Sequence, residues 1–231
     1  MYGFYGGTDV LYLIALFAIL IISVWAQSRV QSVFKRYAGT RVSSGMSADH
    51  IAESLLARQG YNTQITPVEG NLTDHYNPKT GVVGLSTQVY GSDSISAVAV
   101  AAHEIGHVVQ YHEGYGPIRF RNAVLPVAAI GSQAAPWIVL LGVFMGSFNL
   151  AMVGVILFGV MLLFQLVTLP VEFNASSRAL RMLEEGNYIS YEESDQAKKV
   201  LRAAALTYVL AALSVLISFM RLLSIARRTR R

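Results

Sequence analysis

The sequence contains no cysteine. This absence excludes disulfide bonds and thiolate ligands, so any zinc ion must be held by His, Asp or Glu. Charged residues are also scarce, at 14% of 231 residues against 53% hydrophobic ones. With a mean hydropathy of +0.44, the chain is too apolar for an ordinary soluble domain, and its composition indicates membrane spans.

The 18 Lys and Arg residues outnumber the 14 Asp and Glu residues, which gives a formal net charge of +4. The basic residues gather beside apolar runs, as membrane-flanking charges do. We therefore expect the lipid bilayer as a partner and no nucleic acid. The sequence shows no internal repeat and no low-complexity linker, and it does not indicate an oligomeric state.

A stretch from Ser94 to Gly114 carries the chemistry. It predicts a helix with Asp93 or Ser94 as its N-cap and Gly114 at its end. Within it, His103-Glu104-Ile105-Gly106-His107 forms an H-E-x-x-H arrangement. Histidines at this spacing lie one turn apart on one helix face, where both can bind one Zn²⁺ ion per chain with Glu104 beside them. The alternative, two satisfied core histidines and a buried acid, is disfavoured because such groups are costly to bury without a partner.

The chain begins with an apolar run from Val10 to Gln27 that is long enough to cross a bilayer. A signal peptide is the competing interpretation, but no Lys or Arg precedes the run, so we expect an uncleaved anchor over residues 1–28. Basic residues follow it, beginning with Arg29. This asymmetry predicts that the next segment lies in the cytoplasm.

Residues 29–122 form the expected catalytic region. Ser47 and Gly60 bound a predicted helix over Ala48–Gln59, and a short antiparallel sheet is expected after it, with a strand at Thr63–Val68 and a hairpin of Leu72–Tyr76 and Val82–Thr87. An extended peptide could add to a free strand edge at Val82–Ser86. A small supporting sheet without that role is an equally good interpretation.

The apolar region from Ala123 to Val171 is about twice as long as one crossing requires. Gly146–Asn149 divides it, so residues 123–171 are expected to form a transmembrane hairpin, with an irregular first arm because of Pro126 and Pro136. Two crossings return the chain to the side that it left.

A new helix is expected to open at about Leu169, at the end of the hairpin, and to continue into a segment of residues 172–202 that carries the third ligand. A catalytic zinc site needs three protein ligands and one open position, and Glu172 is on the correct side to be the third. His112 and Glu113 turn away from the histidine face, whereas His75 remains a weaker alternative. Alternatively, Glu172 is a surface acid near a helix N-terminus, where the helix dipole favours a negative charge.

A capping box at Ser190–Glu193 starts the last helix, which continues into an apolar stretch at Ala203–Met220. Residues 203–231 are thus expected to form a membrane helix and a basic tail. Five arginines follow Met220. A full fourth crossing would place them outside, against the positive-inside tendency, and the sequence leaves this conflict open.

Taken together, the H-E-I-G-H string, the downstream E-G-Y-G-P-I-R, the hairpin and P-V-E-F-N-A-S-S-R-A-L resemble the YugP-type neutral zinc metallopeptidases, which are bacterial membrane proteins. More distantly, the layout is similar to the heat-shock membrane protease and CAAX prenyl protease group. The resemblance implies His103, His107 and Glu172 as zinc ligands, in a gluzincin-like site, and Glu104 as the catalytic acid. The distant group has an aspartate four residues after the glutamate ligand, where this chain has Ser176. Support for the ligands is therefore expected from Ser176, Asn174 or another group.

We thus expect a mainly α membrane protein with about four membrane helices and a small α+β zincin-like region. The expected function is a multi-pass cell-membrane zinc endopeptidase with a cytoplasmic active site, which cleaves membrane proteins or membrane-proximal peptides with Glu104 as general base and acid. A non-catalytic zinc-stabilised scaffold is the alternative, and a transporter is disfavoured because the polar residues lie outside the spans. Five residues are candidate oxyanion donors without a choice among them: His75, Arg178, Tyr188, Tyr191 and Tyr208.

Overall fold

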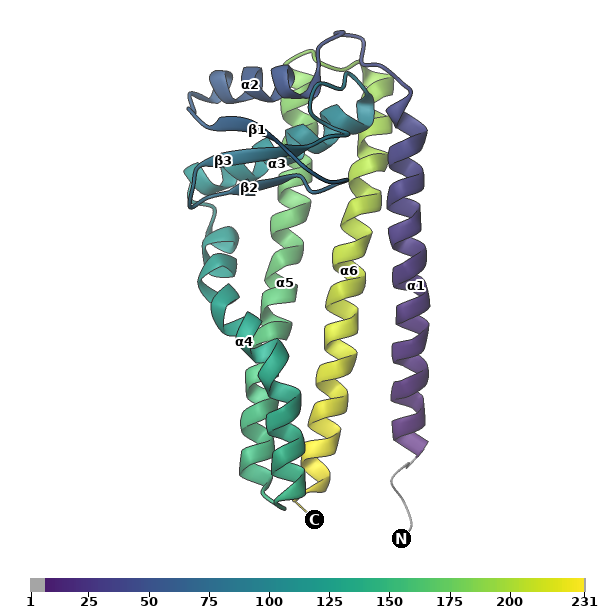
Figure 1. Cartoon of the computed structure of the whole chain (residues 1–231), viewed down its shortest axis with the longest axis vertical. Coiled ribbons are helices and arrows are strands. Elements are labelled where there is room, and N and C mark those ends of the chain that lie inside the picture. The colour runs from purple at the N-terminus through teal and green to yellow at the C-terminus, as the bar shows by residue number, and fades with distance from the viewer. Residues whose placement is uncertain (1–6, 231) are drawn as a thin grey trace. The chain divides into compact units, whose positions relative to one another are not determined.

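The structure is a computed structural model that describes residues 7–230 (Figure 1). The elements in chain order are α1 (Gly7–Ala38), α2 (Ala48–Gln59), β1 (Gln64–Val68), β2 (His75–Asn77), β3 (Val82–Ser86), α3 (Ile95–His112), α4 (Gly116–Phe144), α5 (Phe148–Glu185) and α6 (Tyr191–Arg228). They divide into two compact units. The span unit comprises residues 1–26, 119–169 and 207–231, and the mixed unit comprises residues 27–118 and 170–206.

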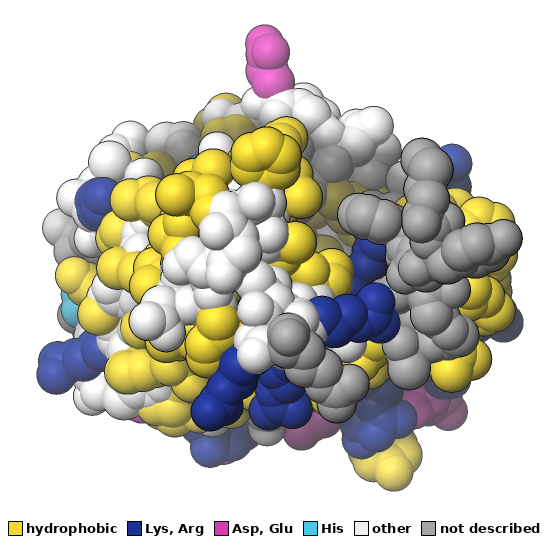
Figure 2. Space-filling model, turned by 90° about the horizontal axis from the view of Figure 1, so that it is seen from below, with side chains coloured by type: hydrophobic (Ala, Val, Ile, Leu, Met, Phe, Trp, Pro, Cys, Tyr) yellow, Lys and Arg dark blue, Asp and Glu magenta, His cyan; other side chains and the backbone are white. Residues whose placement is uncertain are grey.

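The span unit consists of helices whose large apolar side chains point outward. Four helices of the described chain, α1, α4, α5 and α6, are long and apolar enough to cross a membrane, which confirms the expected number of membrane helices. Their backbones approach closely at glycines: a Cβ added to Gly142 would lie 2.3 Å from the backbone nitrogen of Ala151. Figure 2 shows a face on which hydrophobic side chains lie beside Lys and Arg side chains.

Prolines do not end the helices of the hairpin. Pro126 and Pro136 both lie inside α4, and Pro170 lies inside α5, which is one helix from Phe148 to Glu185. The expectation that a new helix opens near Leu169 is therefore wrong. One proline removes one backbone hydrogen bond, whereas ending a helix in an apolar environment would leave several backbone groups without partners.

The mixed unit has the principal hydrophobic core. Its largest fully buried side chains include Ile51 of α2, Leu85 of β3, and Ile95 and Ile105 of α3. Helix α2 has the predicted bounds, and Gly60 ends it with a φ of +73°. The capping box that starts α6 is also confirmed, since Ser190 N donates to Glu193 Oε2 (2.6 Å) and Glu193 N donates to Ser190 Oγ (3.3 Å).

The sheet of the mixed unit has the strand order β1-β3-β2. Strands β2 and β3 pair in antiparallel fashion, as predicted for the hairpin, but β1 pairs with β3 in parallel, so the expectation of an antiparallel sheet is wrong for β1. The proposed free edge at Val82–Ser86 is also wrong, because β3 is the central strand. Val83 and Leu85 are fully buried, and a strand buried in this way is favoured in the centre of a sheet.

Candidate metal centre

Helix α3 places two histidines on one face. Ser94 is its N-cap, and the Ser94 side chain accepts a hydrogen bond from the backbone N–H of Ala97. Most of the small and apolar residues of the helix are buried. The ring centroids of His103 and His107 lie 4.7 Å apart. Both side chains remain accessible, at 15% and 13% of their surface. Two imidazoles are thus held side by side on a rigid element.

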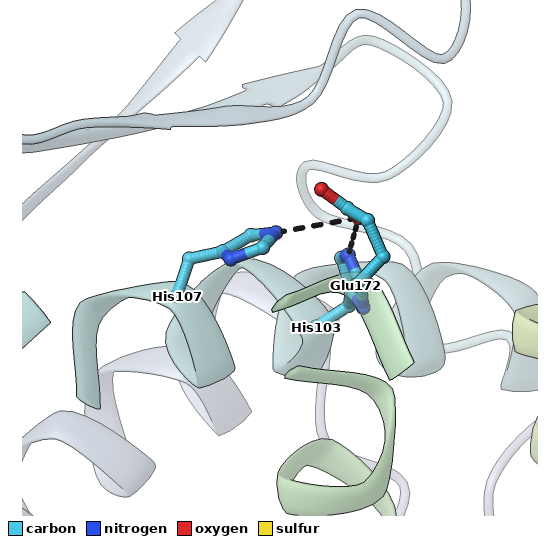
Figure 3. A group of neighbouring side chains, drawn as sticks. All are labelled: His103, His107 and Glu172. Carbon is cyan, nitrogen blue, oxygen red and sulfur yellow. Dashed lines mark ion pairs between the residues drawn. The ribbon is translucent and has the colours of Figure 1, made fainter. Parts of the chain in front are cut away.

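Helix α5 supplies a carboxylate to the same place, as Figure 3 shows. Glu172 Oε2 lies 3.3 Å from His103 Nε2 and 3.6 Å from His107 Nε2, and the Glu172 side chain is 5% exposed. Potential ligand atoms of these three residues all lie within 4.8 Å of one another. The structure therefore brings together the three residues that the sequence analysis selected as ligands.

The distances can be tested against the geometry of a zinc site. Tetrahedral ligands at about 2.0–2.1 Å from the metal are separated from one another by about 3.3–3.4 Å. The Nε2–Oε2 separations of 3.3 and 3.6 Å are at or slightly above that value, and the three ligand atoms all lie within 4.8 Å of one another. Two imidazole nitrogens and one carboxylate oxygen are also a donor set that occurs in catalytic zinc enzymes. The residues present fit a zinc ion.

Gly106 permits the approach of α3 to α5. A Cβ at this position would lie 2.6 Å from the backbone oxygen of Ala175, a distance that real Cβ atoms essentially never show. The position between the two histidines in sequence is thus where the two helix backbones meet. Only glycine allows this contact without moving the Glu172 helix away from the rings.

The second nitrogen of each imidazole also has a partner. Ser176 Oγ lies 3.1 Å from His103 Nδ1, in agreement with the expectation that Ser176 supports a ligand. Gln110 Oε1 lies 3.0 Å from His107 Nδ1. An acceptor at Nδ1 favours the tautomer whose Nε2 lone pair is available to a metal.

Sequence reasoning missed Gln110. This side chain is fully buried, and its Nε2 donates to the backbone oxygen of Val171 (2.8 Å) and to Asn174 Oδ1 (2.9 Å). Gln110 therefore connects His107 to the residues on either side of Glu172. The only available signal was its position three residues after His107, one turn along the same helix face.

Arg178 extends this hydrogen-bonded network. Its Nε donates to Asn174 Oδ1 (2.8 Å), and its Nη1 lies 2.6 Å from Glu113 Oε2. The sequence makes Arg178 a candidate oxyanion donor and turns Glu113 away from the histidine face. The two side chains form an ion pair that joins α5 to the end of α3.

Glu104 is buried beside the cluster, with 7% of its surface exposed. Burial raises the pKa of the Glu104 carboxyl, and electrostatic interactions with His103 and His107 oppose this increase. Asp74 contributes to the increase as a neighbouring negative charge. The pKa of Asp74 is itself raised by burial, although Ser86 N and Ser86 Oγ donate to it at 2.7 and 2.9 Å.

The remaining candidates lie outside the three-residue cluster. His75 is an exposed residue of β2 whose Nδ1 lies 2.9 Å from the backbone oxygen of Thr73. The His112 ring stacks on Tyr61 at 4.3 Å between centroids. Tyr191 is 93% exposed, Tyr188 belongs to the mixed unit and Tyr208 belongs to the span unit. None of these positions identifies an oxyanion donor.

Comparison with known proteins gives a consistent result. Residues 12–227 match the family model described as "Putative neutral zinc metallopeptidase". The chain is 44% identical over 216 residues to "Putative membrane protease YugP" of Bacillus subtilis (strain 168), which covers 93% of this chain and 96% of that protein. No solved structure matches the chain.

Proposed function

The chain belongs to the family of putative neutral zinc metallopeptidases, and from this premise we propose that it is an integral membrane zinc endopeptidase. His103, His107 and Glu172 hold one zinc ion, and Glu104 is the general base and acid. One observation carries the proposal: ligand atoms from positions far apart in sequence converge at zinc-site distances beside a buried carboxyl group.

The residues of the chain have distinct tasks in peptide hydrolysis. A zinc ion at this site supplies Lewis acidity toward a peptide carbonyl oxygen and toward water. Glu104 accepts the proton of the attacking water and transfers it to the nitrogen of the leaving amine. Ser176 and Gln110 keep the two imidazoles in position.

The number of protein ligands favours a hydrolase over a structural zinc scaffold. A structural zinc site is usually closed by four protein ligands, whereas a catalytic one has three. Within the described residues, the cluster contains His103, His107 and Glu172 and no fourth member. This set leaves one coordination position for water or substrate.

Membrane proteins or membrane-proximal peptides are the proposed substrates. Leu169 is the last residue of α5 that belongs to the span unit, and Glu172 follows three residues later. At a rise of about 1.5 Å per residue, the carboxylate is about 4.5 Å farther along the helix axis. A site this close to a lipid-crossing segment favours peptides presented at the bilayer.

The proposed location of the site is the cytoplasmic side. Helix α6 is long and apolar enough to cross, so the five arginines after Met220 belong to the opposite side. Eleven basic residues flank the span ends that lead to or from the mixed unit: Arg29, Lys35, Arg36, Arg41, Arg119, Arg121, Arg178, Arg181, Lys198, Lys199 and Arg202. The larger number indicates the cytoplasmic side, even with the basic tail counted against it.

The test is a Glu104→Gln variant of the full chain in detergent or proteoliposomes, assayed with wild type for bound zinc and for cleavage of a membrane-protein substrate. Loss of a general base lowers the rate by about 10²–10⁴-fold, and zinc content should stay unchanged because Glu104 is not a ligand. Glu53→Gln, which changes an exposed acid of α2 in the same unit, provides the control. Equal cleavage by Glu104→Gln and wild type would refute the role of Glu104, and zinc-free wild type would refute the metal site.

A further inference from the structure

A second site, which does not depend on peptidase activity, lies in a groove between the mixed-unit parts of α5 and α6. The groove has a volume of about 410 Å³. Three cationic side chains line it: Arg181 of α5, and Lys198 and Arg202 of α6. We propose that this groove binds the phosphate headgroup of an anionic phospholipid, with the upper part of its acyl chains against the apolar lining.

The charge of the groove favours an anion. Glu184 is its one acidic lining residue, and the Glu184 carboxylate already accepts a hydrogen bond from Ser194 Oγ. Within the described residues, neither Lys198 nor Arg202 forms an ion pair. Arg181 Nε lies 3.9 Å from Glu185 Oε1, and both side chains are exposed. Such a surface ion pair is weak, so the Arg181 guanidinium can still bind a phosphate.

The apolar part of the lining favours a lipid over a free phosphate ion. Phe173, Leu180 and Leu201 line the same groove as the cations, and Phe173 is 49% exposed. An exposed aromatic ring beside three cations is the arrangement that an amphiphile requires, because one end of the ligand is charged and the other is apolar.

Along both helices, the groove residues are also separated by only a few positions from residues of the span unit. Phe173 follows the last span-unit residue of α5 by four positions, and Ala205 precedes the first span-unit residue of α6 by two. These separations correspond to about 6 Å and 3 Å along the helix axes. Basic pockets between membrane helices are suited to anionic headgroups. An acidic soluble peptide would not need this proximity.

The groove shares one side chain with the metal centre. Ser176 lines the groove, and its Oγ lies 3.1 Å from His103 Nδ1.

The test compares lipid binding by the purified full chain in detergent, measured by native mass spectrometry with equimolar phosphatidylglycerol and phosphatidylcholine. Wild type should retain phosphatidylglycerol in preference to phosphatidylcholine. In the double variant Arg181→Gln/Arg202→Gln, the affinity for phosphatidylglycerol should fall about tenfold or more, since each cation near a headgroup contributes about 1 kcal/mol. The charge-preserving variant Arg181→Lys/Arg202→Lys should keep it.

A matched control removes two cations elsewhere in the mixed unit. Arg58 and Lys79 are both exposed and lie outside the groove, so Arg58→Gln/Lys79→Gln should bind lipid as wild type does. All three double variants alter exposed side chains, and an unchanged melting temperature verifies that they fold. Equal lipid loss in the control, or no loss in Arg181→Gln/Arg202→Gln, would overturn the site.

Two further arms identify the ligand. Phe173→Ala should weaken phosphatidylglycerol binding about threefold, because it removes apolar contact and no charge. Inorganic phosphate and an acidic soluble peptide, each at the lipid concentration, should not displace the lipid. Displacement by phosphate would indicate an anion site without lipid selectivity, and displacement by the peptide would indicate a peptide site; either result contradicts the proposal.

Discussion

The span unit and the mixed unit differ in the exposure of their large apolar side chains. In the mixed unit, Ile51, Leu85 and Ile105 are fully buried, whereas in the span unit Ile130 and Ile156 are 66% and 65% exposed. The mixed unit is stabilised by removing apolar surface from water. The helices of the span unit are apolar enough to cross a membrane. In lipid that driving force is absent between helices, and close contacts at small residues stabilise their association instead.

The two units also differ in charge. Every Asp and Glu of the sequence except Asp9 belongs to the mixed unit. Carboxylates are costly in a bilayer unless they are paired, so acid–base chemistry is concentrated where water and hydrogen-bond donors can reach it. Helix α5 belongs to both units, because its first part lies in the span unit and its continuation carries Glu172 to the histidines.

The largest expected effect concerns this connection. Glu172→Gln should lower zinc affinity by more than about 100-fold, since it removes the charged ligand itself and changes that only support a ligand cost up to about that much. Competition with a zinc chelator on the purified full chain measures it. Glu185→Gln, an exposed acid on the same helix, is the control and should bind zinc normally. Equal zinc affinity of Glu172→Gln and Glu185→Gln would show that Glu172 is not a zinc ligand.

A smaller effect is expected from the support of the ligands. Gln110→Met keeps the approximate volume but removes three hydrogen bonds, so zinc affinity should fall about 10–100-fold. Ser176→Ala removes one contact with His103 and should have a smaller effect. Gln88→Met changes an exposed glutamine of the same unit and serves as the control. Normal zinc affinity of Gln110→Met would show that the network is not needed to position His107.

Gly106 of the mixed unit and Gly131 of the span unit each lie against a backbone oxygen of another helix, so a Cβ at either position would clash. An alanine Cβ at Gly106 meets the Ala175 oxygen at 2.6 Å, and one at Gly131 meets the Leu157 oxygen at 2.7 Å. Each substitution should cost about 1–3 kcal/mol of stability. Only Gly106→Ala should also weaken zinc binding, because it separates α3 from α5 at the metal centre.

Thermal unfolding and zinc titration of the two glycine variants measure both effects. Gly159→Ala is the control in the span unit, since its Cβ would meet only Phe219 at 3.4 Å. Loss of zinc in Gly131→Ala with normal zinc in Gly106→Ala would contradict the assigned contact.

The smallest effect concerns pH. Burial raises the pKa of Asp74 above its ordinary value, which is about 3.9 in an unfolded chain. A carboxyl group with a raised pKa in the folded state contributes stability below its unfolded pKa and loses that contribution as the pH rises through the folded pKa. Wild type should therefore lose stability relative to Asp74→Asn between pH 4 and neutrality. Melting temperatures across that range test it, and a pH-independent difference would refute it.

Local elements were predictable because their signals are local. The bounds of α2, the Ser94 cap and the Ser190–Glu193 capping box follow from turn and cap chemistry within a few residues. The sheet was less predictable. The strand positions follow from composition, but the central place of β3 depends on what packs against Val83 and Leu85 from elsewhere in the chain.

The family was also accessible from the sequence, because the resemblance extends over nearly the whole chain and the comparisons confirm it. The continuity of α5 through Pro170 was not accessible. A proline predicts a helix end from local geometry alone, and the continuing helix depends on what surrounds it.

The sequence by itself determined the spacing of His103 and His107, the place of Glu104 between them and the presence of four apolar helices, because periodicity and composition act over short distances. Only the tertiary structure decided that Gln110 supports His107, that Gly106 touches Ala175 and that a cationic groove lies between α5 and α6. Each of these features joins residues more than 10 positions apart or depends on such a contact, and the partner of a buried polar group is set by packing.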